Sequence, residues 1–410
     1  MTYIFLGLLI FCAHLFNAWF SRRRIPDVLL LVGIGILVGP VFGLITPGQL
    51  SGVGPILSSL TLLFILFDSG IDMRLDLVRR YWTGVVQVTL LSYVLSLVAV
   101  TLVCRFMVGL QWQSSMMVGT MVAGTGASIV IPLVNQMRVS EKARITLTLE
   151  SAISGVIAIV VTLAFMEGFK LGNVSVPSML GRVLATVVVS LIIGFAGGVF
   201  WSSMMDRVRK LENSMFLTPA FVFVMYGVTS LIGFSGAIAS LTFGLVMGNP
   251  EYFHITFLHK LKLGEMTPLT DNEKSFFKEF VFILKTYFFV YIGISIPFTN
   301  AWAFVYGAII AAVLCLVRFA LVYFVGKENT TDERLSVSIL IPKGLIAAVL
   351  ASIPEQVNLS VGYNVIPYAS FIKNIVYAVI FCSIIFCSVL VLVFSKKLMM
   401  PQLSKDEKQP

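Results

Sequence analysis

Charged residues are scarce in this sequence, making up 12% of its 410 residues, whereas soluble domains are about a quarter charged. Hydrophobic residues make up 58% of the sequence. A soluble globular protein of this size could not bury that much apolar surface. The apolar runs are about 17–25 residues long, the length with which an α-helix crosses a bilayer. Runs such as Val85–Val103 and Ile375–Phe394 lack the alternation expected of membrane-barrel strands. The composition therefore predicts an all-α membrane protein.

Cysteine and histidine are also rare, with five and three residues. No cysteine pair has a redox or metal-ligand spacing, and all five lie in apolar runs, which favours a packing role. No nucleophile, metal cluster or phosphate-binding loop stands in a plausible context, so the sequence predicts neither an enzyme nor a cofactor. The cysteines are Cys12, Cys104, Cys315, Cys382 and Cys387.

Thirteen transmembrane helices are predicted from the apolar runs. The first run lacks a basic leader and a small-residue cleavage site, so we interpret it as a helix rather than a signal peptide. The longest loop, 249–275, is too short for a soluble domain. The predicted spans are 3–20, 26–42, 55–72, 82–109, 113–135, 144–167, 181–205, 215–232, 234–248, 276–298, 301–326, 334–354 and 365–396.

Most of the 29 basic residues fall in alternate loops and in the C-terminal tail. Cytoplasmic loops collect Lys and Arg, so we expect a multi-pass plasma-membrane protein with its N-terminus outside and its C-terminus in the cytoplasm. The net charge of +9 is spread along the chain as topology determinants. Because the basic residues form no single patch, a nucleic-acid partner is not predicted, and the lipid bilayer is the expected environment.

Helix-breaking residues interrupt the fifth and twelfth predicted helices. They are Gly124, Gly126 and Pro132 in the fifth, and Pro342 and Gly344 in the twelfth. Broken helices in matching positions of two halves indicate a transporter's binding site. The positions predict a six-plus-six inverted repeat with broken crossing helices, joined by the seventh helix. The alternative is that these small residues only allow close helix packing.

Two charged residues are expected near the crossing of the broken helices. Glu150 shares a helix face with Ser154, and Lys343 lies on the twelfth helix, so we expect the two charges to be partners. The pair is either an ion pair that a cation or proton can break, or a fixed salt bridge between the two halves. Asp68 is expected to be a solvated charge at a helix end, and the role of Arg318 stays open.

Four segments together resemble the monovalent cation:proton antiporter superfamily, in its NhaP-like sodium/proton exchanger branch. They are RIPDVLL at 24–30 leading to Gly39-Pro40, FDSGI at 67–71, FILKTYFFVYIG at 282–293 and IPKGLIAAVLA at 341–351. The resemblance implies the sodium/proton antiporter fold and a homodimer that exchanges Na⁺ or K⁺ for H⁺ by an elevator-type movement.

The resemblance also implies a division into domains. Residues 1–80 and 211–299 would form a dimerisation domain, with helices 1–3 and 8–10. Residues 81–170 and 300–397 would form the core transport domain, with helices 4–6 and 11–13. Residues 171–210 would be a linker helix, and 398–410 a cytoplasmic tail.

The sixth predicted helix departs from the family's pattern. Gly155 stands where the family has the aspartate that carries the ion and the proton, and Thr125-Gly126 replaces a Thr-Asp pair. Three alternatives follow. Glu150 has become the carrier, transport continues without proton coupling or for another solute, or the chain is a transport-inactive membrane partner. In the first alternative the oxygen ligands, which suit a hard cation, would come from Thr125, Ser128, Ser151 and Ser154.

Overall fold

The computed structural model describes residues 2–23, 27–50, 52–73, 75–134, 137, 139–170, 176–212, 214–253, 266–296, 301–325, 331–361 and 365–394. All the secondary-structure elements within these ranges are helices, which confirms the all-α prediction. Six of the described helices are long and apolar enough to cross a membrane by length and composition, and four further apolar helices are shorter.

Each predicted span contains one helix or two halves of a broken helix. The fifth span divides into α5 and α6, and the twelfth into α14 and α15. The bounds are α1 Thr2–Arg23, α2 Asp27–Ile36, α3 Val53–Asp72, α4 Leu75–Val103, α5 Trp112–Ala123, α6 Ala127–Val134, α7 Glu141–Lys170, α8 Val176–Val208, α9 Leu217–Leu231, α10 Gly236–Gly248, α12 Asp271–Ser295, α13 Ala301–Val325, α14 Thr331–Ile339, α15 Leu345–Val361 and α16 Ala369–Val393.

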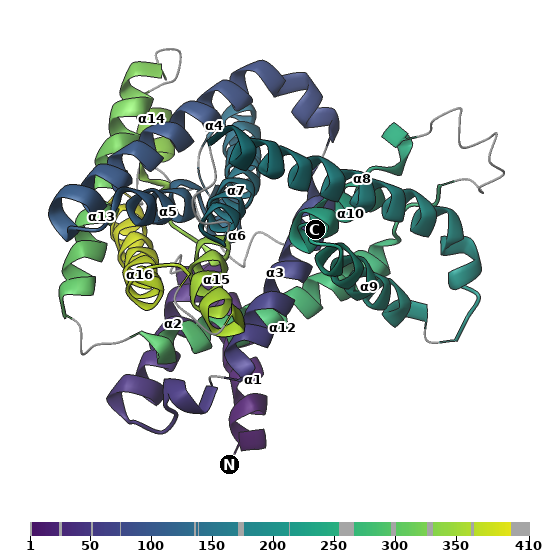
Figure 1. Ribbon diagram of the computed structural model, residues 1–410, viewed down its shortest axis with the longest axis horizontal. Helices are drawn as coiled ribbons and strands as arrows, with labels where there is room; N and C mark the ends of the chain where they lie inside the picture. The colour runs from purple at the N-terminus through teal and green to yellow at the C-terminus, as the bar shows by residue number, and fades with distance from the viewer. Residues whose placement is uncertain are drawn as a thin grey trace, which may run out of the picture.

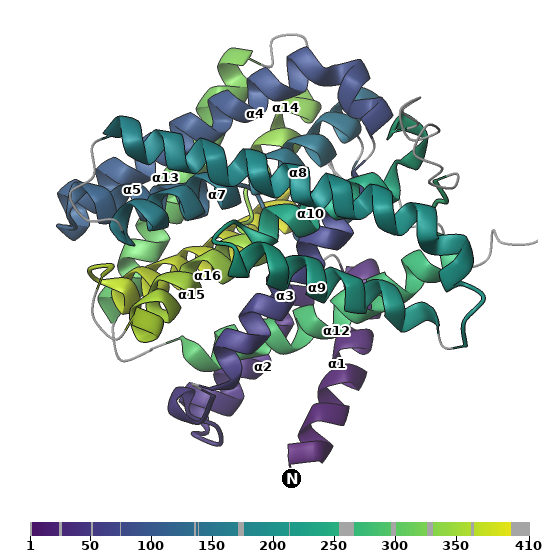
Figure 2. The same cartoon turned by 45° about the vertical axis from the view of Figure 1, so that its right-hand side comes forward.

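The helices form two groups that share a long contact (Figures 1 and 2). In one group α4, α5, α7 and α13 to α16 pack on one another. In the other α3 packs on α10 and α12, and α8 packs on α10. Between the groups, α15 contacts α3 and α12, and α7 contacts α8. The division into a core and a dimerisation domain stays a prediction.

Close approach of α3 and α10 depends on glycine. A Cβ on Gly244 would lie 2.1 Å from the Phe67 carbonyl oxygen, and one on Gly70 would lie 2.3 Å from the Leu241 carbonyl oxygen. Small residues let membrane helices approach until their backbones touch, which gains van der Waals contact that lipid cannot supply. The contact holds α3 in place, and α3 is the helix that carries Asp68.

The start of α12 is fixed by side chains rather than by its apolar run. Thr270 and Glu273 form a reciprocal capping box, so the helix begins several residues before the predicted span at 276. Arg209, which follows α8, donates to both Glu273 carboxylate oxygens, at 3.1 Å and 2.8 Å. Burial works to raise the pKa of Glu273, but the hydrogen bonds from Arg209 and Thr270 outweigh it and hold that pKa below its usual value.

Replacing Gly244 with alanine is expected to weaken the α3–α10 contact. The added methyl group has no room beside Phe67, and overpacking of this kind costs about 1–3 kcal/mol in free energy of unfolding. The measurement is the melting temperature of the purified protein in detergent, which should fall. Gly227 in α9 has open space at its Cβ, so Gly227→Ala is the control and should preserve the melting temperature. Equal melting temperatures for the two variants would contradict the close contact.

Candidate functional site

Two broken helices cross at the centre of the first group. α5 ends at Ala123, where Gly124 turns to an extended conformation, and α15 resumes after the non-helical residues 340–344. The Gly126 amide donates to the Pro342 carbonyl oxygen at 2.8 Å, which ties the two breaks together. A Cβ on Gly126 would lie 2.7 Å from the Gly344 Cα, so only glycine permits this approach. The predicted broken helices are confirmed.

Lys343 supplies hydrogen bonds that the broken helix α5 lacks. Its side chain is 1% exposed, and its Nζ donates to the Gly124 carbonyl oxygen at 3.1 Å and to that of Ala123 at 3.5 Å. These carbonyls lie at the C-terminal end of α5, where the helix dipole is negative and attracts a cation. The Lys343 amide donates to the Ser383 hydroxyl at 3.0 Å. Lys343 therefore stabilises the crossing itself.

The Glu150 carboxylate is bound by Arg318, and not by Lys343 as the sequence led us to expect. Arg318 Nη2 donates to Glu150 Oε2 at 2.8 Å, and Nη1 donates to Oε1. The planar fork of an arginine matches both oxygens of a carboxylate, whereas the Lys343 ammonium already contacts the α5 carbonyls. The expected pairing was wrong because a sequence does not show which helix lies opposite Glu150.

The ion pair joins four helices of the same group. Arg318 of α13 also donates to the Ser92 hydroxyl of α4 at 3.2 Å and to the Val337 carbonyl oxygen of α14 at 3.2 Å. Glu150 belongs to α7, and both charged side chains are less than 5% exposed. A buried charge costs several kcal/mol unless it is paired and hydrogen-bonded, and here each group has its partner. The geometry is that of a structural pair.

The predicted hydroxyl ligands meet in part. Thr125 Oγ1 and Ser154 Oγ lie 3.0 Å apart, and the Thr125 amide donates to Ser154 Oγ at 3.2 Å. Ser151 Oγ donates to the Thr148 carbonyl oxygen within α7 at 2.9 Å, and the Ser151 carbonyl oxygen accepts from Ser154 Oγ at 3.3 Å. Ser128 and Pro132 fall within α6, but their side chains are outside the described part of the chain.

An apolar side chain lies against Gly155, where the sequence comparison led us to expect an aspartate in relatives. Gly155 is buried in α7, and a Cβ there would lie 2.7 Å from Ile346 Cδ1 of α15. The end of the Ile346 side chain therefore lies where it would meet any Cβ at position 155. An aspartate at 155 would require the isoleucine side chain to move.

A cavity of about 460 Å³ reaches the crossing from one end of α3. Its walls come from α3, α6, α7, α12 and α15, and they include Gly126 and Ile346 beside the break. The charged residues in its lining are Asp68, Asp72, Arg144 and Lys285. We call it the Asp68 cavity. Glu150 is not among the residues that line it.

Asp68 was expected to be a solvated end charge, but its side chain is only partly exposed and lines the cavity. Asp72, one helical turn further along α3, is half exposed and lies 3.4 Å from the Lys278 ammonium. Asp68 and Asp72 are four residues apart, so both carboxylates lie on one face of α3. This spacing was the feature of the sequence that indicated an acidic helix face. The packing of α3 on α12 and α15 could not be read from that spacing.

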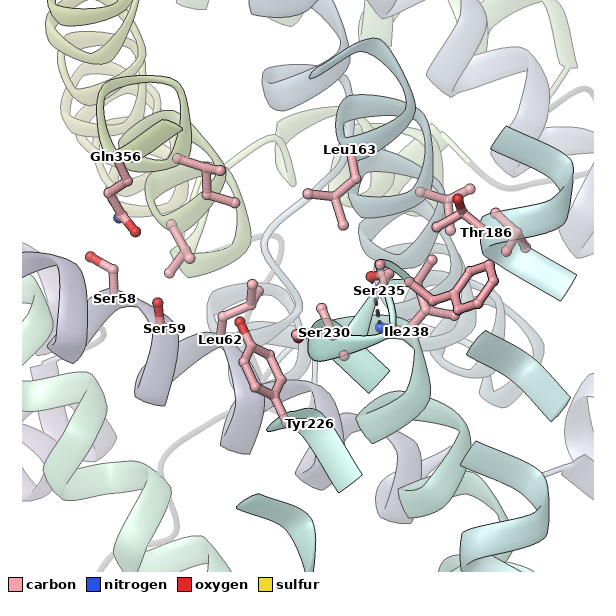
Figure 3. A pocket seen from close by; sticks show the side chains of 18 residues that line it. Ser58, Ser59, Leu62, Leu163, Thr186, Tyr226, Ser230, Ser235, Ile238 and Gln356 are labelled. Carbon is pink, nitrogen blue, oxygen red and sulfur yellow. Dashed lines mark hydrogen bonds between the residues drawn. The ribbon is translucent and has the colours of Figure 1, made fainter. Parts of the chain in front are cut away.

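A second cavity, of about 320 Å³, lies toward the other end of α3. Figure 3 shows Ser58, Ser59 and Tyr226 on one side of it, with Gln356 and Leu163 across from them. Hydroxyl and amide groups supply its polar lining, and none of the residues that line it is charged. We call it the Tyr226 cavity.

Crossed broken helices beside a cavity with carboxylates define a multi-pass membrane protein of the secondary-transporter type. Residues 7–398 match the family model described as sodium/hydrogen exchanger, transmembrane, so the chain belongs to that family.

Relatives and solved structures agree with this assignment. The chain is 23% identical to Na(+)/H(+) antiporter 1 of Methanocaldococcus jannaschii over 362 residues, which cover 85% of this chain and 82% of that protein. It is 24% identical over 240 residues to K(+)/H(+) antiporter NhaP2 of Shewanella sp. (strain MR-4), which cover 56% of this chain and 40% of the relative. The structure of the sodium proton antiporter MjNhaP1 from M. jannaschii superposes with a TM-score of 0.76 at 19% identity, over 95% of this chain and 99% of that one. The fold prediction is confirmed.

Removing Arg318 is expected to destabilise the protein strongly. In Arg318→Ala the Glu150 carboxylate stays buried without its counter-charge, which costs about 3–5 kcal/mol in free energy of unfolding. The double variant Glu150→Gln/Arg318→Met should recover much of this loss because no buried charge remains. Thermal or denaturant unfolding in detergent measures both.

The exposed pair of Lys278 and Asp72 provides the control. Lys278→Ala should change the free energy of unfolding by at most about 1 kcal/mol, because solvent screens the pair. If Arg318→Ala proved as stable as Lys278→Ala, the structural role of the buried pair would be wrong.

Proposed function

We propose that this chain exchanges Na⁺ or K⁺ for protons across the membrane. Membership of the exchanger family supports this proposal, as do relatives named as Na⁺/H⁺ and K⁺/H⁺ antiporters. The observation that carries it is the Asp68 carboxylate, which lines a cavity that reaches the crossing of the broken helices. A carboxylate binds either a proton or a cation, so one site can carry each in turn.

Asp68 is a better carrier than Glu150 on physical grounds. Both Glu150 oxygens accept hydrogen bonds from Arg318, so a cation could bind there only after that pair had separated. The separation would leave the Arg318 guanidinium buried without a counter-charge, at a cost of several kcal/mol. Asp68 is partly exposed to a cavity and pays no such cost. We therefore assign the competition between proton and cation to Asp68, with Glu150 as a structural residue.

Oxygen ligands for the cation are available where the cavity meets the crossing. Gly126, Ala127 and Thr148 line this end of it. Thr125 directly precedes Gly126, and its hydroxyl lies 3.0 Å from the Ser154 hydroxyl. Carbonyl and hydroxyl oxygens suit hard cations such as Na⁺ and K⁺. The carboxylate would supply the charge, and the crossing would supply neutral ligands.

An elevator-type movement belongs to the same proposal. The Asp68 cavity lies between α3 and α12 on one side and α6, α7 and α15 on the other, which are the predicted dimerisation and core domains. Sliding one group past the other would change the side to which the crossing is open. A homodimer held by the dimerisation domain, with its N-terminus outside and its C-terminus in the cytoplasm, would give the core a fixed frame.

Proteoliposomes that contain a pH-sensitive dye test the exchange. Addition of Na⁺ or K⁺ should dissipate an imposed proton gradient, and Asp68→Asn should abolish this dissipation because an amide takes up no proton. Asp72→Asn is the matched control on the same helix face. It should retain most of the activity, because Asp72 is half exposed and paired with Lys278.

Other outcomes distinguish the remaining alternatives. Cation flux without proton movement would indicate an uncoupled channel or carrier on the same scaffold. Absence of both would indicate a membrane partner that does not transport. Exchange that survives in Asp68→Asn but disappears in a well-folded Glu150→Gln variant would return the carrier role to Glu150.

A further inference from the structure

The two cavities have three helices in common. Residues of α3, α7 and α15 line both the Asp68 cavity and the Tyr226 cavity. The Tyr226 cavity in Figure 3 is bounded by Ser58 and Leu62 from α3 and by Gln356 from α15. The Asp68 cavity uses later residues of α3 and earlier residues of α15. The cavities therefore lie one after the other along a common seam.

The layer between the cavities is thin on α3 and on α15. On α15, Ile346 lines the Asp68 cavity and Val349 lines the Tyr226 cavity. On α3, Ile65 lines the Asp68 cavity and Leu62 lines the Tyr226 cavity. Three residues of an α-helix rise about 4.5 Å, so less than one helical turn separates the two linings on α3 and on α15. On α7 the step from Ala152 to Val160 is eight residues, or about 12 Å. All four side chains on α3 and α15 are apolar, and apolar constrictions stop water and ions by dewetting.

Ile346 has the central place in this layer because of its neighbour on α7. The α7 residues Ala152 and Val160 line the Asp68 and Tyr226 cavities, and Gly155 lies between them in the sequence. A Cβ on Gly155 would lie 2.7 Å from the Ile346 Cδ1 atom, which is too close for an unshifted side chain. Glycine at 155 thus leaves room for the isoleucine to extend across the seam.

We propose that Ile346 is the gate that separates the two cavities, and that Gly155 is the residue that makes room for it. The interpretation of the two cavities as access paths to one ion site rests on the proposed function. The existence of a barrier between the cavities does not rest on it. The seam would be closed by the apolar side chain that lies against Gly155. Shortening this one side chain should join the two cavities into one continuous path.

Cysteine labelling in membrane vesicles tests the gate. The five native cysteines are replaced by alanine, and Ser69→Cys is introduced to report on the Asp68 cavity from α3. Ser59→Cys, in a separate variant, identifies the side from which the Tyr226 cavity is reached. The probe is a membrane-impermeant cationic methanethiosulfonate. The medium contains choline instead of Na⁺ or K⁺, so that an exchanger has no cation to carry.

With Ile346 present, Ser69→Cys should be labelled from one side only, opposite to the side that labels Ser59→Cys. With Ile346→Gly or the milder Ile346→Ala, Ser69→Cys should become labelled from both sides. Ile353→Gly is the matched control, since Ile353 lies two turns along the same face of α15 within the Tyr226 cavity. It should leave the labelling one-sided.

Two results would overturn the gate. One is that Ser69→Cys stays labelled from one side in both Ile346 variants while their melting temperatures show that they are folded. The other is that Ile353→Gly opens the path equally well, which would indicate general loosening of α15. Labelling needs no ion exchange. If the labelling pattern is as expected but no cation/proton exchange is measured, the gate is supported and the proposed antiport is not.

Discussion

Backbone groups freed by a broken helix must find partners inside a membrane protein, and this constraint organises the centre of the molecule. Hydrocarbon supplies no hydrogen bonds, so a break is tolerated only where other groups replace the lost ones. The Lys343 ammonium binds the carbonyls at the end of α5, and the Gly126 amide binds the Pro342 carbonyl of the opposite chain segment. Each break thus completes the other, and glycines at 126 and 344 allow the contact.

Charges near the crossing divide into structural and accessible groups. Lys343 and the Glu150–Arg318 pair are buried and fully engaged, and they connect α4, α5, α7, α13 and α14 into one unit. Asp68 lies on α3, which packs on α10, α12 and α15, and its side chain lines a cavity. On this account the rigid unit supplies neutral oxygens and the neighbouring helix supplies the titrating carboxylate.

The sequence predicted the features that local chemistry determines. Apolar runs located the helices, and the glycine and proline residues of the fifth and twelfth spans located both breaks. It could not predict contacts between helices that are distant in the chain. Arg318 is 168 residues from Glu150, and no local pattern relates them, so Lys343 was chosen wrongly. Gly155 was recognised as a departure, but only the structure shows Ile346 filling the space beside it.

The central claim is that one carboxylate, Asp68, holds either a proton or a cation. Proton release measures this competition without any transport. When Na⁺ or K⁺ is added to the purified protein in weakly buffered detergent solution, the account predicts that protons are released. It also predicts that a folded Asp68→Asn variant releases none, whereas Asp72→Asn still does. Release that is unchanged in Asp68→Asn, or absent from the unmodified protein across the pH range, would contradict it.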